Sequence, residues 1–201
     1  MELDTCECEI KSPNSKIMMK VRLTEEGEVL FSLYKEGKTI FEESPLGIFT
    51  SVADFTTGLS ILSSSRRAID ERYRMIGRKK AIYENHCNEL VLKLGKKIHS
   101  IYLIIRVYDD GVAYRYYIPG EGPITISFET GGFRMAKAAL GWAMEFNPNY
   151  EGFYLKRSYE ELLNGKDYAM PLLLNMEDNW VLISEAGVYG HYCGSHLKGD
   201  G

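Results

Sequence analysis

The chain has 201 residues with a formal net charge of −4, and 45% of its residues are hydrophobic. This length and apolar fraction suffice for one well-packed domain or two small ones, and one domain is the simpler expectation. The lack of an overall basic charge argues against nucleic acid and against an anionic membrane as partners. No apolar run reaches the roughly 20 residues that a membrane-spanning helix needs, and the acidic start is not followed by a hydrophobic signal segment. As written, the sequence predicts a cytoplasmic protein, and a periplasmic or secreted one if a signal peptide was removed.

The four cysteines lack the spacing of metal or redox sites. No two of them form a CxxC pair, and two that lie only two residues apart would strain a disulfide. We interpret all four as ordinary thiols: Cys6, Cys8, Cys87 and Cys193.

Short apolar or alternating runs separated by turn residues dominate the first fifty positions. Residues 16–23 and 28–35 flank the turn sequence Glu25-Glu26-Gly27 and predict a hairpin. Residues 38–44 add a third strand. This pattern is typical of an antiparallel β meander.

The segment SIYLIIRVYDDGVAYRYYIPG, residues 100–120, carries the strongest hairpin signal. A two-residue loop ending at Gly111 would place Arg106 directly opposite Arg115, and like charges in that arrangement are unfavourable. We therefore predict a three-residue loop, 109–111, with Gly111 in the left-handed region and Arg106 opposite Tyr114.

Helix is scarce. Residues 158–165, SYEELLNG, combine a capping box of Ser158 and Glu161 with Gly165 as a stop signal, which predicts one or two helical turns. Before this helix, residues 124–129 carry a further strand signal. After it, the chain returns to two strands on either side of a polar turn at 177–179. Such a number of short strands predicts a mainly β fold, a sandwich with one or two short helices.

A carboxylate, Glu185, follows the apolar run Val181-Leu182-Ile183. Alternation places Val181, Ile183 and Glu185 on one face, so the carboxylate lies at a strand end. A buried and unpaired carboxylate would cost several kcal/mol. The residues alone therefore favour a solvated strand end, then a structural salt bridge, and give a metal or catalytic role the least support.

The histidines could contribute to a metal site or to an acid/base pair. His191 and His196 lie five residues apart with Cys193 between them, but without a second ligand pair, surface or partly packed histidines are favoured over zinc ligands. His86 and Glu89 could form an acid/base pair, although acidic and amide residues ahead of a strand more often serve a turn.

Residues 63–80 carry seven basic side chains against two acidic ones. A phosphate-binding patch is conceivable, but a charged and solvated edge strand is favoured because no stacking platform or helix N-terminus accompanies them. No GxSxG, P-loop, HExxH or GxGxxG motif occurs in the sequence. The basic residues are Arg66, Arg67, Arg72, Arg74, Arg78, Lys79 and Lys80, and the acidic ones are Asp70 and Glu71.

The order of several segments resembles the N-terminal domain of glycoside hydrolase family 97, a family of α-glucosidases and α-galactosidases. The resemblance runs from about Ser12 to about Leu197, and RVYDDGVAYRY together with LISEA is its most specific part. The segments are SPNSKIMMKV, YKEGKTIFEESPLGI, NHCNELVLKL, YLIIRVYDDGVAYRYYIPG, GWAMEFNPNYEGFY and PLLLNMEDNWVLISEAGVYGHY.

This resemblance implies a β-supersandwich similar to galactose mutarotase over residues 12–197, with 1–11 as an N-terminal extension and 198–201 as the start of a linker. In the family, the domain packs against a catalytic (β/α)8 barrel that follows it and supplies the catalytic carboxylates. We therefore expect no catalytic residue within this chain. The expected partners are the barrel of the same polypeptide and the oligosaccharide substrate of the full enzyme.

The resemblance also implies a calcium site beside the substrate pocket. The N-terminal glutamate of that site falls on Glu185, and Asn149 in NPNYEGFY is a second, weaker candidate. Calcium takes roughly six to eight oxygen ligands. The site in this chain would therefore be incomplete, with the remaining ligands on the barrel.

Two other functions stay open beside this leading hypothesis. An aldose epimerase acting alone would use Glu185 as the base and His86 or His191 as the acid. A stand-alone sugar-binding module would instead stack sugar rings on aromatic side chains, although most tyrosines in β-rich domains simply pack with their hydroxyl groups in water. These side chains include Trp142, Tyr150 and Tyr154.

Overall fold

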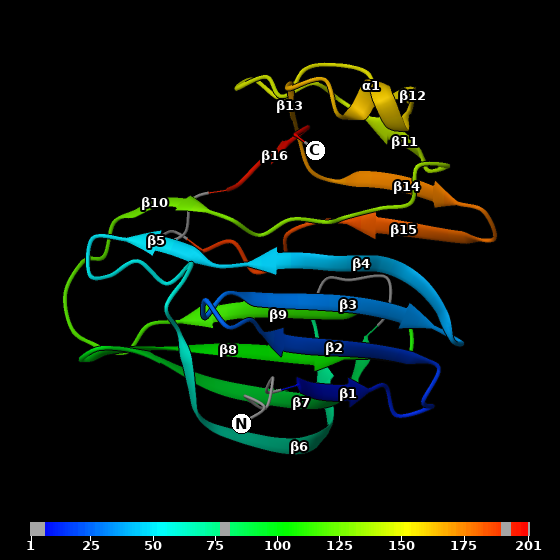
Figure 1. The fold of residues 1–201 in the computed structure, drawn as a ribbon. Helices are drawn as coiled ribbons and strands as arrows, with labels where there is room; N and C mark the ends of the chain where they lie inside the picture. Colours follow the sequence, from blue (N-terminus) through cyan, green and yellow to red (C-terminus); the bar gives the residue numbers. More distant parts are fainter. Residues whose placement is uncertain (1–6, 77–80, 190–193, 201) are drawn as a thin grey trace. The chain divides into compact units, whose positions relative to one another are not determined.

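The computed structural model describes residues 7–76, 81–189 and 194–200. Its contacts divide the chain into two compact units, Met1–Arg134 and Met135–Gly201. Figure 1 shows that nearly all of the regular structure is strand, arranged in several antiparallel sheets. The predicted mainly β fold is confirmed, and the domain boundaries stay a prediction.

Among the described residues, the first unit contains two four-stranded sheets and one strand pair. The sheets have the strand orders β1-β2-β3-β4 and β6-β7-β8-β9, and the pair is β5 with β10. The bounds are β1 (Glu7–Lys11), β2 (Ile17–Leu23), β3 (Val29–Lys35), β4 (Lys38–Leu46), β5 (Ile48–Thr50), β6 (Ser60–Arg74), β7 (Ile82–Lys96), β8 (His99–Val107), β9 (Val112–Tyr117) and β10 (Ile126–Glu129). The predicted meander of the first fifty residues is confirmed by the pairing of β2, β3 and β4.

The core of the first unit lies between its two four-stranded sheets. The Phe31 ring of β3 meets the Tyr114 ring of β9, with 6.5 Å between the ring centroids. Alternate residues of β7 and β8 point toward the same interior, because side chains change face at each step along a strand. These fully buried cross-strand pairs are Leu90 with Ile105, Leu92 with Leu103 and Leu94 with Ile101.

The β8–β9 hairpin turns one residue earlier than predicted. Arg106 lies opposite Ala113 instead of Tyr114, and the Tyr108 N–H donates to the Gly111 carbonyl at 2.8 Å. The predicted three-residue loop with a left-handed Gly111 is therefore wrong. The observed register meets the same electrostatic requirement, because it also keeps two arginines from facing each other.

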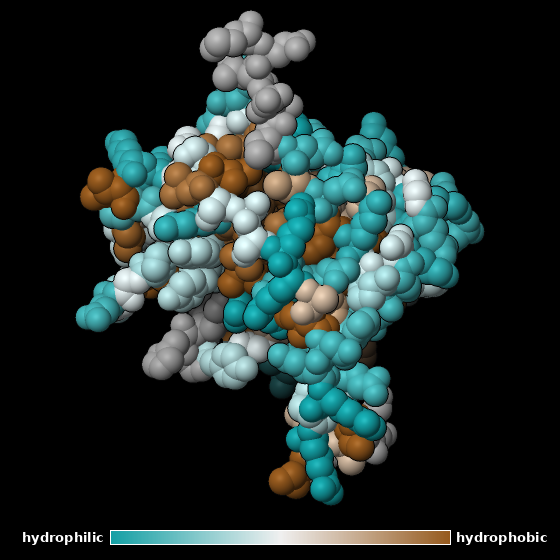
Figure 2. Space-filling model, turned by 90° about the horizontal axis from the view of Figure 1, so that it is seen from below, coloured by the Kyte–Doolittle hydropathy of each residue, from teal (hydrophilic) through white to brown (hydrophobic). Residues whose placement is uncertain are grey.

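β6 lies at the edge of its sheet and pairs only with β7. The predicted edge strand is thus confirmed for the described part of residues 63–80. Figure 2, which looks toward this edge, shows mostly hydrophilic side chains with scattered hydrophobic ones. The predicted turn around His86 and Glu89 is wrong, because β6 pairs with β7 along its whole length and holds that segment in a continuous strand.

Among the described residues, the second unit contains a four-stranded sheet, a short strand pair and one α-helix. The sheet order is β12-β11-β14-β15, and β13 pairs with β16. No helix of the described chain is long and apolar enough to cross a membrane. The bounds are β11 (Leu140–Ala143), β12 (Leu155–Ser158), α1 (Tyr159–Leu162), β13 (Asp167–Tyr168), β14 (Leu172–Met176), β15 (Asn179–Ile183) and β16 (Leu197–Lys198).

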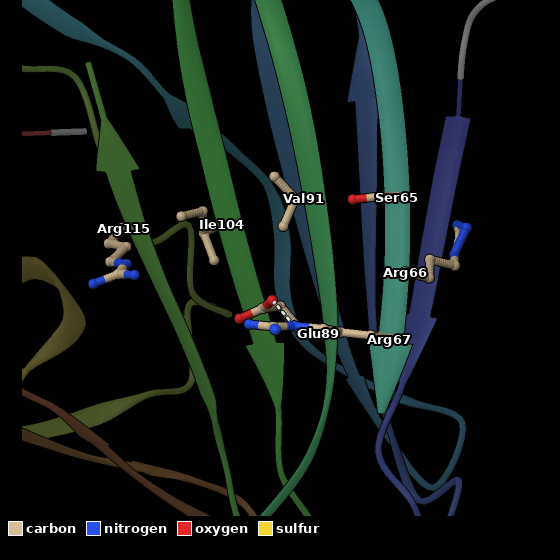
Figure 3. A pocket seen from close by; sticks show the side chains of 7 residues that line it. All are labelled: Ser65, Arg66, Arg67, Glu89, Val91, Ile104 and Arg115. Atoms are coloured by element: carbon tan, nitrogen blue, oxygen red, sulfur yellow. Dashed lines mark hydrogen bonds and ion pairs between the residues drawn. The ribbon is translucent and has the colours of Figure 1, made fainter. Parts of the chain in front are cut away.

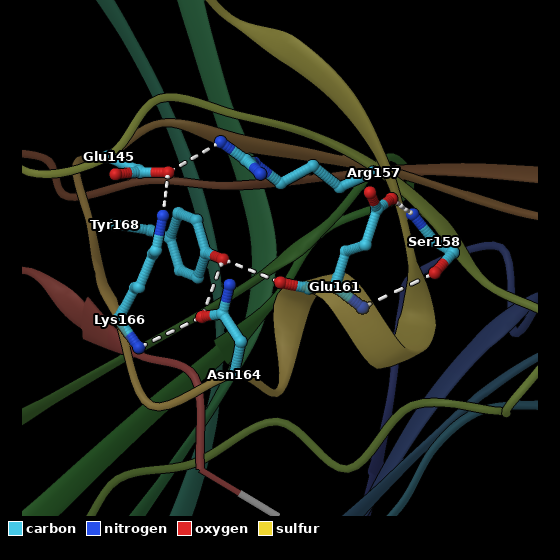
Figure 4. Close-up of polar contacts among 7 residues, drawn as sticks. All are labelled: Glu145, Arg157, Ser158, Glu161, Asn164, Lys166 and Tyr168. Atoms are coloured by element: carbon cyan, nitrogen blue, oxygen red, sulfur yellow. Dashed lines mark hydrogen bonds and ion pairs between the residues drawn. The ribbon is translucent and has the colours of Figure 1, made fainter.

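The helix α1 begins as the sequence predicts. The Glu161 N–H donates to the Ser158 hydroxyl, and the Ser158 N–H donates to the Glu161 carboxylate at 2.7 Å, which completes the capping box. Figure 4 shows how Tyr168 holds this turn, with its hydroxyl donating to the Glu161 carbonyl at 2.8 Å. The Tyr168 side chain is buried, so this bond anchors α1 to the interior of the unit.

The predicted hairpin of β14 and β15 is also confirmed. Met176 faces Asn179 across the turn, and β15 forms one edge of its sheet. Ile183 is buried, whereas Trp180 and Leu182 are exposed on the other face. The apolar run before Glu185 therefore alternates faces as expected.

Candidate functional site

The carboxylate of Glu185 lies two residues beyond the end of β15 and is half-buried. Both of its oxygens accept hydrogen bonds from Ser195. The backbone N–H of Ser195 donates to Oε2 at 3.0 Å, and its hydroxyl donates to Oε1 at 2.6 Å. Among the described residues Glu185 forms no ion pair. The carboxylate is therefore neither free at a strand end nor salt-bridged, but held in one orientation by a single residue.

Asn149 lies on the exposed loop between β11 and β12. Its backbone N–H donates to Oδ1 of Asn147 at 3.1 Å, and the Asn147 amide donates to the Glu151 carbonyl at 3.2 Å. Such asparagine-centred turns order a loop without regular structure. The loop borders an open depression of about 450 Å³, whose lining includes Phe146 and Phe153.

Residues 195 and 196 connect the two candidate calcium ligands. While Ser195 binds Glu185, the imidazole of His196 stacks on Phe146, with 4.5 Å between ring centroids and an angle of 24°. Phe146 in turn meets the ring of Tyr150, which follows Asn149. Two adjacent residues thus contact Glu185 on the one hand and, through Phe146, the loop of Asn149 on the other.

Of His191, Cys193 and His196, which the sequence weighed as zinc ligands and favoured as ordinary side chains, only His196 is described. His191 and Cys193 lie outside the described residues. His196 is packed on an aromatic ring, with Nε2 at 3.7 Å from an oxygen of Asp167. Within the described part of the chain, no group of three or more His, Cys, Asp or Glu residues could hold a metal ion.

The first unit contains a buried carboxylate that the sequence does not reveal. Glu89 of β7 is only 3% exposed, and the strand register places Arg67 of β6 and Arg106 of β8 directly beside it. As Figure 3 shows, the Glu89 carboxylate meets the Arg67 side chain; the distances from Glu89 oxygens are 2.6 Å to Arg67 Nε and 2.8 Å to Arg106 Nε. Burial raises the pKa of Glu89, but the hydrogen bonds and charges of both arginines outweigh it and hold the pKa below its usual value.

In the triad of Arg67, Glu89 and Arg106, each oxygen of the buried carboxylate accepts a hydrogen bond from an arginine, and these two cations favour the ionised form of Glu89. His86 points to the opposite face of β7, where Nδ1 lies 3.7 Å from an Asp70 oxygen. The acid/base pair of His86 and Glu89, which the sequence left as the less favoured alternative, is therefore not formed. An open depression of about 440 Å³ adjoins the triad.

The aromatic candidates have different settings. Tyr150 and Tyr154 are exposed, whereas Trp142 of β11 lies beside Trp180 of β15. Trp180 was not among the sequence candidates, although alternation along β15 already placed it on the face away from Ile183. Pairing between strands that are not sequence neighbours brings the two indoles together.

The two described cysteines belong to no metal-holding group of the described residues. Cys87 is a buried thiol on β7, and Cys8 is half-buried on β1. Cys6 and Cys193 lie outside the described residues.

Comparison with known proteins identifies relatives of this fold. The family described as Glycosyl-hydrolase 97 N-terminal matches residues 10–201. A probable retaining alpha-galactosidase from Streptomyces bingchenggensis is 30% identical over 172 residues, which are 85% of this chain and 27% of that protein. The crystal structure of a beta-arabinopyranosidase has a TM-score of 0.87 at 29% identity and covers 96% of this chain and 34% of that one.

A more distant solved structure has the same fold. A glycoside hydrolase family 97 enzyme from Pseudoalteromonas sp. strain K8, in complex with panose, has a TM-score of 0.72 at 17% identity. The match covers 85% of this chain and 27% of that enzyme. The chain thus spans about a quarter to a third of the length of these relatives. Because the family match covers nearly every residue, the chain belongs to the N-terminal domain family of glycoside hydrolase family 97.

Proposed function

We propose that this chain is the non-catalytic N-terminal domain of an α-glycoside hydrolase and packs on a catalytic (β/α)8 barrel of the same polypeptide. The observation that carries this proposal is the family match over residues 10–201. The greater length of the relatives supports it, because this chain spans 27% of one and 34% of another. An oligosaccharide with pyranoside units is the proposed substrate of the full enzyme.

Glycoside hydrolysis requires a pair of carboxyl groups flanking the scissile bond. The carboxylate of Glu89 does not fit such a role, because it is buried away from any substrate and is paired with Arg67 and Arg106. We therefore assign the catalytic carboxylates to the barrel. The purified 201-residue chain should release no sugar from α-glucosides or α-galactosides.

Glu185 is the proposed calcium ligand of this domain. A carboxylate offers about four acceptor positions, and the two hydrogen bonds from Ser195 leave the others available. A half-exposed carboxylate with a fixed orientation suits a hard cation, whereas the roughly six to eight ligands of calcium require further oxygens. Asn149, on an exposed loop of the same unit, is the weaker second candidate.

Bound beside the pocket, calcium would add positive charge near the catalytic carboxylates and orient sugar hydroxyl groups. This chain would contribute one carboxylate ligand, held in a fixed orientation. Ser195 fixes that orientation, because its hydroxyl donates to Oε1 of Glu185 and its backbone N–H donates to Oε2.

The test is a calcium titration of the polypeptide that includes the barrel. Glu185→Gln should weaken calcium binding at least about tenfold, as the loss of ligand or supporting groups does in other metal sites. Glu177→Gln is the matched control, because Glu177 lies in the exposed turn between β14 and β15. Equal calcium affinity of the wild type and Glu185→Gln would refute the role of Glu185.

The gene sequence tests whether a barrel follows this domain. The reading frame after the Gly201 codon should continue into alternating β and α units. A frame that stops there, with no barrel encoded next to it, would contradict the proposed partner.

A further inference from the structure

The two tryptophans of the sequence lie side by side on one sheet of the second unit. Trp142 and Trp180 are the only tryptophans among the 201 residues. Their ring centroids are 5.2 Å apart, and the rings are inclined by 39°. Trp180 is 59% exposed. We call this pair the tryptophan platform.

The platform is built on three hydrogen-bonded strands. Trp142 lies on β11 and faces Leu173 of β14, while Trp180 lies on β15 and faces Asn175 of β14. Strands two positions apart in a sheet are separated by about 10 Å. The indole rings therefore lean toward each other across β14, and the strand pairing fixes their positions.

Polar groups border the platform. The Lys156 ammonium of β12 lies over the Trp142 ring, 5.8 Å from its centroid, so Trp180 is the more open ring of the pair. The side chain of Asn175 is half-buried beside Trp180. An apolar stacking surface with an amine and an amide at its margin matches the two chemical aspects of a pyranose ring, a C–H face and a rim of hydroxyl groups.

We propose that the tryptophan platform binds neutral pyranoside oligosaccharides. The ligand class rests on the proposed function, whereas the site itself does not involve Glu185. A protein partner of ordinary affinity would need about 800 Å² on this side. The two indole rings of the platform offer a much smaller surface, of the size of one or two sugar rings, and Leu182, which is also exposed on this face, does not belong to the ring pair.

The platform carries its own spectroscopic signal, because no other residue contributes tryptophan fluorescence. The 201-residue chain should be titrated with maltotriose and with raffinose, which present α-glucosyl and α-galactosyl units. Binding should change the emission, with a millimolar dissociation constant typical of a small stacking site. Trp180→Ala should weaken binding about tenfold or more, and Trp180→Phe should restore part of it.

Leu182→Ala is the matched control. It removes a side chain of similar exposure, 62%, from the same face of the same strand, and it should leave saccharide binding within about twofold of the wild type. Far-UV circular dichroism of each variant verifies that the fold is retained.

Three results would overturn the proposal. The first is that neither sugar changes the fluorescence emission or shifts the indole N–H signals in the NMR spectrum. The second is sugar binding that Trp180→Ala leaves unchanged. The third is a chain that binds no sugar but self-associates with rising concentration, when Trp180→Ala abolishes this self-association. The last result would make the platform a protein contact. Because the calcium titration depends on Glu185 and not on Trp180, failure of either proposal can be told from failure of the other.

Discussion

Replacing both arginines beside Glu89 should lower the free energy of unfolding by far more than the sum of the two single replacements. The Arg67 side chain is 66% exposed, so its pair with Glu89 should contribute little to the free energy of unfolding. The Arg106 side chain is 31% exposed, and replacing it with leucine should cost about 1.5 kcal/mol. In both single variants, the other arginine still pairs with the buried carboxylate.

The double variant Arg67→Leu, Arg106→Leu leaves Glu89 buried without a cation. A buried carboxylate that has lost its partners costs about 4 kcal/mol. The free energy of coupling between the two arginines is therefore about 2 kcal/mol. Most of their interaction runs through Glu89, which touches both of them, because the direct repulsion between the two guanidinium groups is the smaller effect.

Urea unfolding followed by far-UV circular dichroism measures these free energies. Tryptophan fluorescence is unsuitable, because both tryptophans belong to the second unit and the triad to the first. In a Glu89→Gln background the same double substitution should lose most of its coupling. Additive costs, or equal coupling with and without the Glu89 carboxylate, would refute the reasoning.

Three further predictions concern single positions. Gly27→Ala should destabilise the chain by at least about 2 kcal/mol more than Gly37→Ala in urea unfolding. Both glycines have positive φ, but only a Cβ at Gly27 would overlap backbone atoms. Equal losses of unfolding free energy in the two variants would contradict this. Tyr168→Phe should cost about 1–2 kcal/mol, since the buried hydroxyl donates to the α1 backbone, and fluorescence-detected unfolding that shows no loss would refute it. The pKa of Glu89 is held below its usual value of 4.5. The stabilisation that the ionised Glu89 gives the fold is therefore present above pH 4.5 and is lost as the pH falls through the lower folded-state pKa. The urea midpoints of the wild type and Glu89→Gln should converge in acid, and a difference between the midpoints that grows instead would overturn the assignment.

Local signals in the sequence predict a large part of this fold. The hairpins of β2 with β3 and of β14 with β15 follow from alternation around short polar turns. The capping box of Ser158 and Glu161 is likewise complete within four residues. Each of these features depends on residues close together in the chain, and for that reason a single sequence contains it.

The features that escaped prediction depend on distant residues. Glu89 reads as a turn residue, and only the registers of β6 and β8 show that two arginines cover it. Ser195 carries no signal of its own, yet it fixes the carboxylate ten residues before it. The register of the β8–β9 hairpin was missed by one residue, because avoiding opposed arginines permits more than one loop.

The pair of β5 and β10 closes a large loop in the first unit. Figure 1 shows the two strands side by side, and the rings of Phe49 and Phe128 stack with 5.2 Å between centroids. All of β6 to β9 lies between them in the sequence, and those strands pair with their neighbours. Closing a loop costs less entropy once the chain inside it is already folded. We therefore expect the β6–β9 sheet to form first during synthesis, and β5 to wait without its partner until the ribosome has released β10.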